Sequence, residues 1–380
     1  MINTVADKCS NSASDGIEKE KSTSIRAIAF HLPQYHPIPE NDMWWGKGFT
    51  EWTNTAKAKP LFRGHYQPHI PADLGFYDLR LPEARAAQAT LAKSAGLEGF
   101  CYYHYWFGDG RVLLNGPVSE ILRRGEPNFG FCLCWANETW TGVWHGAPKR
   151  ILIEQTYPGE ADHRNHFQYL LPAFRDNRYI RVDGKPVFVI YKPSEIPEVK
   201  KTMILWRKMA EDAGLNGLHL VGVRYFDWNP RDLGLDASIS PQLPPLRPNW
   251  VPWSNPFKKL LNKYHKRRGR PTIYSYEAIL PKLLKRTTSP EVEDYPCIIP
   301  NWDNTPRSKS NGLVLFGSTP ELFRRHFKEA VELCRSLPNG RKFMFIKSWN
   351  EWAEGNHLEP DLKFGLDYLN VVAEELSLVK

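Results

Sequence analysis

The feature that most constrains the fold is a repeated alternation of short, β-rich apolar runs with stretches of helical periodicity. This alternation is typical of βα units arranged around a parallel sheet. Eight such units favour a closed barrel, so we predict an α/β fold of the (β/α)₈ TIM-barrel type. The eight candidate strands comprise residues 25–31, 99–105, 129–135, 186–191, 218–223, 237–240, 297–301 and 342–347.

Helix signals lie between the candidate strands. Pro82 opens a run with small apolar residues on one face that ends at Gly96, and Thr319 followed by Pro320 predicts the start of another helix. The connections after the first and sixth strands are too long for turns, and long loops in compact domains usually carry function. An open doubly wound sheet is the alternative, but its glycine-rich phosphate-binding fingerprint is absent from the sequence.

The chain has 380 residues, which suits one large barrel domain, because barrels of this type reach ~250 residues or more with insertions. We expect a single catalytic domain over residues 25–380, preceded by a polar, disordered segment at residues 1–24. That segment lacks the apolar stretch of a secretion signal, and no run approaches the ~18 apolar residues of a membrane span. We therefore expect a cytoplasmic protein, at most peripheral at the inner face of the membrane.

The formal net charge of +8 is concentrated in part in the basic stretch at residues 258–270. Its lysines and arginines alternate with apolar residues, as in a short amphipathic helix. A solvated helix face is one interpretation, and contact with anionic lipid headgroups or a lipid-linked glycan is the other. The stretch is not a recognisable nucleic-acid reading element, so we expect no specific nucleic-acid binding.

The six cysteines predict neither disulfides nor a metal site. Four of them lie in apolar strand-like runs, where small buried residues are expected. Cys132 and Cys134 are not followed by a second Cys/His pair at zinc spacing. His31 and His36, with Glu51 downstream, lack the fixed helical geometry of a zinc-protease motif. We therefore expect no cofactor and no catalytic metal.

Polar and aromatic residues gather just after the candidate strands. Catalytic groups of a TIM barrel emerge at the carboxyl ends of its strands, so these residues are candidates for binding an oligosaccharide or polysaccharide. For His31, Gln34 and His36 the alternative is structural hydrogen bonding. For Asp303 and Arg307 it is a mutual ion pair that holds their loop. The candidates are His31, Gln34, Tyr35, Trp44, Trp45, Glu51, Trp52, His104, Trp106, Trp135, Asn137, Glu138, Tyr191, Asn301, Asp303, Asn304, Arg307, Trp349, Asn350 and Trp352.

Two glutamates directly after the last candidate strand give the sharpest chemical signal. Glu351 and Glu354 are three residues apart and project from one face of a helical turn. Such pairs are also common on solvated helix faces, but Gly355 here favours a tight turn at the strand end. Cleavage of a glycosidic bond needs one carboxyl group to protonate the leaving oxygen and another to assist the attack. We therefore interpret the two glutamates as catalytic.

The run Glu-Trp-Ala-Glu-Gly at 351–355 resembles the Glu-Trp-x-Glu-Gly motif of glycoside hydrolase family 99, the endo-α-mannosidases. Further runs resemble the related WbsX-type domain of bacterial polysaccharide gene clusters, and together they span nearly the whole chain. These runs are His-Leu-Pro-Gln-Tyr-His at 31–36, Trp-Trp-Gly-Lys-Gly-Phe-Thr-Glu-Trp at 44–52, Cys-Trp-Ala-Asn-Glu at 134–138 and Trp-Asp-Asn-Thr-Pro-Arg at 302–307.

The resemblance implies a (β/α)₈ barrel that acts on a glycosidic bond with retention and without a metal. It implies that Glu351 is the base toward the sugar 2-hydroxyl, giving a 1,2-anhydro sugar, and that Glu354 is the acid and then the base at the glycosidic oxygen. Because WbsX-type domains are often described as glycosyltransferases, transfer to a lipid-linked glycan is one alternative. A non-catalytic glycan-binding barrel is another. The implied context is the biosynthesis of surface polysaccharide or O-antigen.

Overall fold

The computed structural model describes residues 24–142, 147–224, 228–241, 243, 270–284 and 292–379. The segment expected to be disordered, residues 1–24, lies outside the described residues except for Ser24. The basic stretch at 258–270 also lies outside them, except for Arg270. Within the described ranges, no helix is both long enough and apolar enough to cross a lipid bilayer.

Nine parallel strands form a nearly closed barrel, in the order β12, β10, β9, β8, β4, β2, β1, β15, β13. The two strands at the ends of this path, β12 and β13, are separated in the chain only by Pro296, and Phe345 donates a backbone hydrogen bond to the Pro296 carbonyl at 2.9 Å. They are therefore two halves of one barrel position. The strands are β1 Arg26–His31, β2 Gly99–Trp106, β4 Gly130–Trp135, β8 Lys185–Ile190, β9 His219–Val223, β10 Ala237–Ile239, β12 Glu293–Tyr295, β13 Cys297–Ile298 and β15 Phe343–Ile346.

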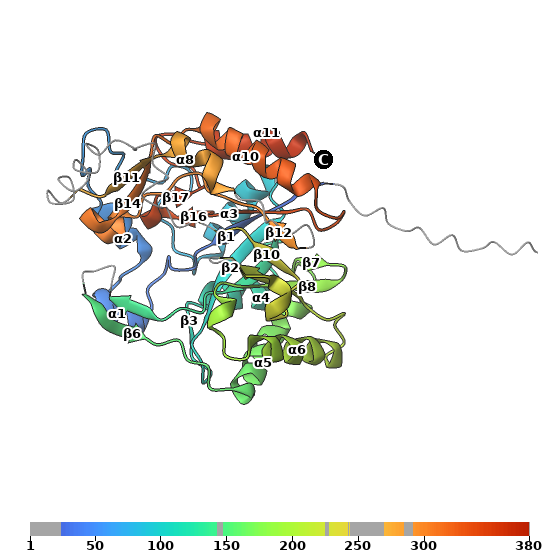
Figure 1. Ribbon diagram of the computed structural model, residues 1–380. Helices are drawn as coiled ribbons and strands as arrows, with labels where there is room; N and C mark the ends of the chain where they lie inside the picture. The colour runs from blue at the N-terminus through green and yellow to red at the C-terminus, as the bar shows by residue number, and fades with distance from the viewer. Residues whose placement is uncertain are drawn as a thin grey trace, which may run out of the picture.

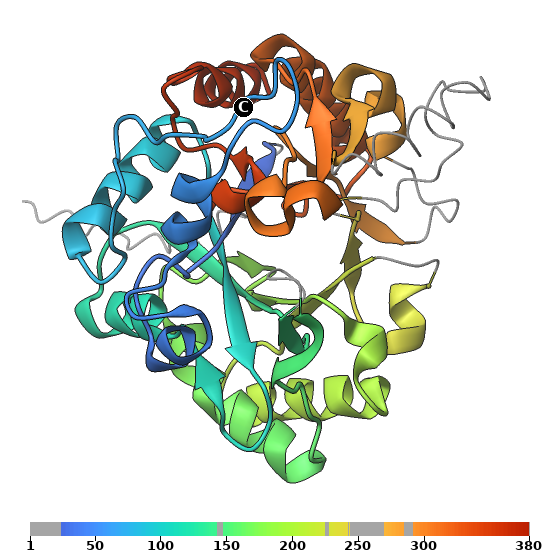
Figure 2. The same ribbon diagram turned by 90° about the vertical axis from the view of Figure 1, so that its left-hand side faces the viewer.

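The predicted barrel is thus confirmed, with each predicted strand overlapping an observed one. Helices surround the strands on the outside of the barrel (Figures 1 and 2). Two of them begin where the sequence predicts, at Pro82 and Pro320, and the Thr319 side chain caps the second by accepting a hydrogen bond from the Leu322 amide. The main helices are α3 Pro82–Ser94, α4 Gly116–Arg124, α5 Glu160–Arg175, α6 Val199–Asp212, α10 Pro320–Arg335 and α11 Asp367–Ser377.

Both long connections carry their own secondary structure. The loop at 32–81 contains α1 Pro39–Trp45 and α2 Glu51–Lys57, and the connection between β10 and β12 contains β11 Thr272–Ser275 and α8 Tyr276–Leu283. β11 pairs in parallel with β14 Leu313–Phe316, which follows the seventh barrel position. The remaining short elements are β3 Val112–Leu113, β5 Trp140–Gly142, β6 Ala147–Ile153, β7 Arg181–Val182, α9 Thr305–Ser308, β16 Asn350–Glu351 and β17 Asn356–His357, with 3₁₀ turns at Pro193–Glu195, Pro230–Leu233, Lys309–Asn311 and Trp352–Glu354.

Strand β2 illustrates how alternate residues face opposite sides of the barrel wall. Tyr103 stacks on Phe30 inside the barrel, with ring centroids 5.5 Å apart. His104, one residue later, points outward and contacts His166 of α5 with Nε2 atoms 2.9 Å apart. Successive side chains of a strand point to opposite faces, so only every second residue near a strand end can reach the barrel mouth.

Candidate active site

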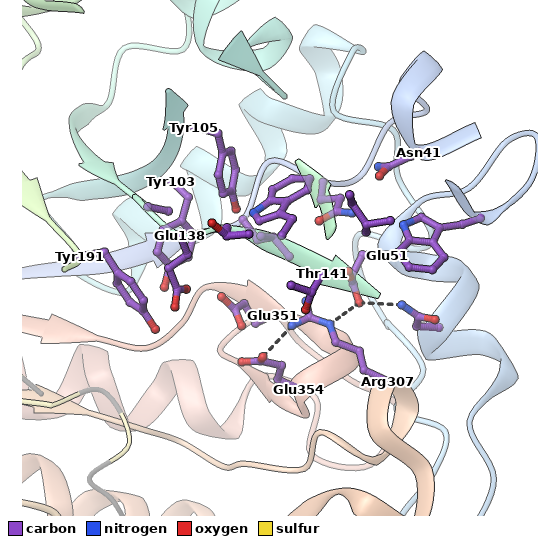
Figure 3. A pocket seen from close by; sticks show the side chains of 18 of the residues that line it. Asn41, Glu51, Tyr103, Tyr105, Glu138, Thr141, Tyr191, Arg307, Glu351 and Glu354 are labelled. Atoms are coloured by element: carbon purple, nitrogen blue, oxygen red, sulfur yellow. Dashed lines mark hydrogen bonds and ion pairs between the residues drawn. The ribbon is translucent and has the colours of Figure 1, made fainter. Parts of the chain in front are cut away.

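A cavity of about 580 Å³ opens at the carboxyl ends of the barrel strands (Figure 3). The loop at 32–81 supplies one wall through α1 and α2, and the β5–β6 hairpin supplies another. This placement is the usual one for a TIM-barrel active site. The lining residues are Leu32, Gln34, Asn41, Trp45, Phe49, Glu51, Asn54, Tyr103, Tyr105, Ala136, Glu138, Thr139, Trp140, Thr141, Leu152, Tyr191, Leu243, Trp302, Arg307, Lys347, Glu351 and Glu354.

The two glutamates of the motif lie together in this cavity (Figure 3). The chain leaves β15 at Ile346, forms β16, and makes a single 3₁₀ turn from Trp352 to Glu354. Gly355 ends the turn with a φ of +57°, and a Cβ atom there would approach the Asp303 Cβ to 2.8 Å. The glycine is therefore needed both for its backbone conformation and for the close approach of the neighbouring loop. This packing fixes the position of Glu354.

Two cations, Lys347 and Arg307, contact the glutamates. The Lys347 ammonium lies 2.9 Å from Oε1 of Glu351 and 3.5 Å from Oε2 of Glu354. The Arg307 guanidinium donates from Nη1 to Oε1 of Glu354 at 2.6 Å and from Nε to Oε1 of Glu51 at 2.8 Å. Figure 3 shows Arg307 between the two carboxylates that it binds. Three carboxyl groups and two cations thus share one buried network.

The charge balance of this network assigns different protonation states to the two glutamates. With all five groups ionised, three negative charges would face two positive ones, and one proton on a carboxyl group restores neutrality. Burial, and next the charge of Glu351, raise the pKa of Glu354. Burial also opposes ionisation of Glu351, but Lys347, a hydrogen bond with Glu354 and Arg307 outweigh it and hold its pKa below the usual range. Glu354 therefore carries the shared proton.

The two oxygens of Glu354 differ in their partners. Oε1 accepts the hydrogen bond from Arg307, whereas the buried Oε2 accepts no hydrogen bond from the described residues and lies 3.5 Å from the Lys347 ammonium. A buried carboxyl oxygen without a donor is a favourable position for a proton. Glu351 differs, because the nearby Lys347 ammonium favours its ionised form.

Aromatic side chains line the walls above the carboxylates. Trp45 and Phe49 come from the loop at 32–81, Trp140 from β5, and Tyr103 and Tyr105 from β2. Trp140 packs edge-on against Tyr105, with ring centroids 5.0 Å apart. Aromatic faces beside carboxylates and amides suit a sugar, whose ring has an apolar face and a hydroxyl-rich edge.

Eight of the candidate residues lie in the cavity lining, and the structure brings them together from five separate segments. They are Gln34, Trp45, Glu51, Glu138, Tyr191, Arg307, Glu351 and Glu354. Glu138 also forms an ion pair with Lys192 at 2.8 Å. The other candidates are outside this lining: His31, Tyr35, Trp44, Trp52, His104, Trp106, Trp135, Asn137, Asn301, Asp303, Asn304, Trp349, Asn350 and Trp352.

Several of these outlying residues hold the scaffold behind the cavity. His31 contacts Gln88 of α3 at 3.2 Å, and the Trp135 indole donates to the Trp106 carbonyl at 2.9 Å. The Asn137 side-chain amide donates to the Lys192 carbonyl and accepts from the Lys192 backbone N–H, both at 2.8 Å. These contacts join strand ends to neighbouring elements outside the cavity lining.

One interpretation of the sequence was that an ion pair between Asp303 and Arg307 holds the loop that follows the seventh barrel position. Asp303 and Arg307 do not form a mutual ion pair. Asp303 accepts from Gln67 at 2.8 Å and contacts His65 at 2.6 Å, whereas Arg307 binds the glutamates. Asp303 thus ties this loop to the loop at 32–81.

Sequence reasoning missed Lys347, Tyr103, Tyr105 and Trp140, all of which line the cavity. Lys347 was visible as the last residue of the eighth candidate strand, four positions before Glu351. Tyr103 and Tyr105 alternate with His104 and Trp106 along one strand. Because alternate side chains of a strand face opposite sides, this pattern could have placed the two tyrosines at the cavity.

A comparison with protein families matches residues 27–372 to the model of glycosyltransferase WbsX. The chain belongs to the WbsX family. It is 37% identical to a protein called WxcX from Xanthomonas campestris pv. campestris strain B100 over 352 residues, and equally so to WxcX from strain ATCC 33913 over 356 residues. These alignments cover 92% of this chain and 49% of each WxcX protein, so this WbsX chain spans about half the length of the curated relatives it matches.

Two solved structures share the fold of this WbsX chain. The GH99 endo-alpha-mannosidase from Bacteroides thetaiotaomicron superposes with a TM-score of 0.54 at 17% identity, over 93% of this chain and 98% of the mannosidase. A glycoside hydrolase-like protein superposes with a TM-score of 0.56 at 16% identity, over 94% of this chain and 95% of its own. The WbsX membership places the chain among carbohydrate-active enzymes, and the structures establish the barrel that it shares with a glycoside hydrolase.

Proposed function

We propose that this chain breaks and re-forms a glycosidic bond with retention of configuration, using Glu351 as base and Glu354 as acid. The observation that carries the proposal is the buried pair itself, in which two cations and one shared proton give the glutamates opposite protonation states. Chemistry at a glycosidic bond needs one ionised and one protonated carboxyl group at the same time.

In the first step, the ionised Glu351 removes the proton from the sugar 2-hydroxyl, and the resulting oxygen attacks the anomeric carbon. The bond from that carbon to the leaving oxygen breaks as Glu354 delivers its proton to that oxygen. The products are a 1,2-anhydro sugar, a free alcohol, a protonated Glu351 and an ionised Glu354. All protons are thus accounted for by the two glutamates.

In the second step, Glu354 acts as the base. It removes a proton from an incoming hydroxyl group, whose oxygen attacks the anomeric carbon and opens the three-membered ring. Glu351 returns its proton to the 2-oxygen, and both glutamates regain their starting states. Two inversions at the anomeric carbon give net retention.

The incoming hydroxyl group decides between hydrolysis and transfer. Water gives a hydrolase, and a sugar hydroxyl gives a transglycosylase. The name of the family favours transfer, so we propose an acceptor glycan in the biosynthesis of surface polysaccharide or O-antigen. We expect this acceptor to be a lipid-linked glycan at the inner face of the membrane, bound in part by the basic stretch at 258–270. A cytoplasmic enzyme of one catalytic domain would meet such a glycan there.

The cation network also has a function in this proposal. Arg307 holds Glu354 through Oε1 and leaves Oε2 free of a hydrogen-bond donor, so that this oxygen can carry the proton. Lys347 keeps Glu351 ionised before substrate arrives. Both cations are thus positioning residues for the glutamates.

The test is to incubate the protein with free and lipid-linked oligosaccharides and to follow products by mass spectrometry. We expect shortened or extended glycans from the wild type and none from Glu351→Gln or Glu354→Gln. Glu138→Gln is the matched control, because it removes a cavity carboxylate that pairs with Lys192 and not with the catalytic glutamates. It should retain most of kcat. Glycan binding without turnover by the wild type would instead support a non-catalytic barrel.

A further inference from the structure

A second group of titratable side chains lies outside the cavity lining. His69 comes from the loop at 32–81, His357 from β17, and Asp361 from the segment after it. All three are buried, and one nitrogen or oxygen atom of each lies within 4.8 Å of the other two. The proposed reaction uses none of them.

Hydrogen bonds hold one nitrogen or oxygen atom of each side chain near a common point. Nδ1 of His357 lies 2.9 Å from the Glu359 carbonyl oxygen, which fixes that nitrogen as the donor and leaves Nε2 as an acceptor. Nε2 lies 2.9 Å from Nδ1 of His69 and 3.9 Å from Oδ2 of Asp361. Oδ1 of Asp361 accepts from the Lys363 and Phe364 amides. An imidazole whose other N–H is held by a carbonyl is the usual arrangement of a metal-ligating histidine.

We propose that His69, His357 and Asp361 bind a Zn²⁺ ion that stabilises the fold beside the active site. Two imidazole nitrogens and a carboxylate oxygen are a ligand set that zinc accepts. Nitrogens ~2.0–2.1 Å from a tetrahedral ion are roughly 3.3 Å apart. The two separations from Nε2 of His357, 2.9 Å and 3.9 Å, lie on either side of that value, so binding requires the side chains to shift and the proton between the two histidines to leave.

The position of the site indicates what the ion would do. The His357 ring stacks on the Trp352 indole with centroids 3.8 Å apart, and Trp352 lies between the two catalytic glutamates in the chain. His69 belongs to the same loop as Glu51. A zinc ion would therefore join the turn that carries the glutamates to the loop that supplies the third carboxylate. This role is structural and independent of the proposed reaction.

The barrel contains an internal control for this geometry. His104 and His166 also face each other with Nε2 atoms 2.9 Å apart, and both are buried. This pair is not part of any group of three potential ligands among the described residues. It therefore tests whether two facing imidazoles alone can hold an ion, since structural zinc normally requires more ligands.

The experiment measures zinc in the full chain. Protein produced with added Zn²⁺ is dialysed, analysed for metal content, and then stripped with a chelator and titrated with ZnCl₂ while its Tm is followed. We expect about one zinc per chain in the wild type and in His104→Gln, and much less than one in His69→Gln and Asp361→Asn. At a hundredfold excess over Kd, zinc should raise the Tm of the stripped wild type by about 3 °C.

The outcomes separate this inference from the proposed function, because neither readout depends on turnover of a glycan. A wild type that binds no zinc overturns the site, as does zinc retained in full by Asp361→Asn. Loss of zinc from His104→Gln alone would move the ion to the other pair and overturn it as well. If His69→Gln does not fold, Asp361→Asn and the wild-type titration still decide, because the asparagine keeps the oxygen that the two amides bind.

Discussion

Removing the charge of Arg307 should destabilise the protein strongly, because two buried carboxylates depend on it. Its guanidinium lies 2.6 Å from Glu354 and 2.8 Å from Glu51, and all three side chains are largely buried. At an effective dielectric constant of about 20, the charge pair with Glu51 gains about 4 kcal/mol before the cost of desolvation, and Glu354, which carries the proton, adds a hydrogen bond to the guanidinium. Breaking a buried pair typically costs about 3–5 kcal/mol, because a charge is left without compensation. We expect Arg307→Met to lose about that much free energy of unfolding.

A second substitution tests whether charge is the cause. Glu51→Gln in the Arg307→Met background removes the carboxylate that lost its cation, so it should recover part of the loss. The expected coupling between the two substitutions is about 1–3 kcal/mol. Arg307→Lys is the control for lost packing, since it keeps the charge but cannot bind both carboxylates with one planar fork. Its loss should be smaller than that of Arg307→Met.

Urea unfolding followed by fluorescence and circular dichroism gives the required free energies. A loss of less than about 1 kcal/mol in the free energy of unfolding of Arg307→Met would refute this prediction, since a buried pair would then have been broken without penalty. The prediction is also refuted if the losses of unfolding free energy caused by Arg307→Met and Glu51→Gln simply add. Additivity would mean that the two side chains do not share an electrostatic network.

The remaining predictions concern the reaction. Glu354→Gln should lose ~10²–10⁴-fold in kcat on poor leaving groups and much less on activated aryl glycosides, whereas Glu351→Gln should fail on both; equal losses with all leaving groups would refute the assignment. Because burial and the charge of Glu351 raise the pKa of Glu354 to about 8, kcat/KM should fall as the pH rises through that region and Glu354 loses its proton; a pH profile that is flat from pH 6 to about 9 would contradict this. Lys347→Met should raise the pKa of Glu351 and move the acidic limb of the same profile to higher pH, and an unmoved limb would exclude Lys347 as its positioning residue. Trp140→Ala should raise KM for an oligosaccharide several-fold with little change in kcat, and the reverse pattern in steady-state kinetics would mean that Trp140 acts in the transition state.

The barrel could be predicted from the sequence because its signals are local. Each strand is a short apolar run, and each helix has its own start and stop residues, such as Thr319 with Pro320. The interruption at Pro296 was not predicted, because a proline in an apolar run does not reveal that its two sides pair with different neighbours.

The candidate site could be predicted only in part, for two physical reasons. The first reason is that alternate side chains of a strand face opposite sides of the barrel wall. His104 and Trp106 were selected because they end a strand, but they contact helix α5. Tyr103 and Tyr105 line the cavity instead. The second is distance along the chain. Arg307 binds Glu51 across 256 residues, and no local pattern encodes such a contact.

The pairing of the first barrel strand with the last has a consequence for the timing of assembly on the ribosome. β1 lies between β2 and β15 and pairs with β15 in a register that joins Ala27 to Met344. A growing chain can order its early helices long before that partner exists, but such long-range pairing forms slowly even in the complete chain. Lys347 and both glutamates follow β15, so the nascent protein lacks the two glutamates proposed as catalytic until the barrel can close. Chains stalled before residue 342 should therefore expose the edge of β1 to chaperones, and protection of stalled chains from limited proteolysis would contradict this expectation.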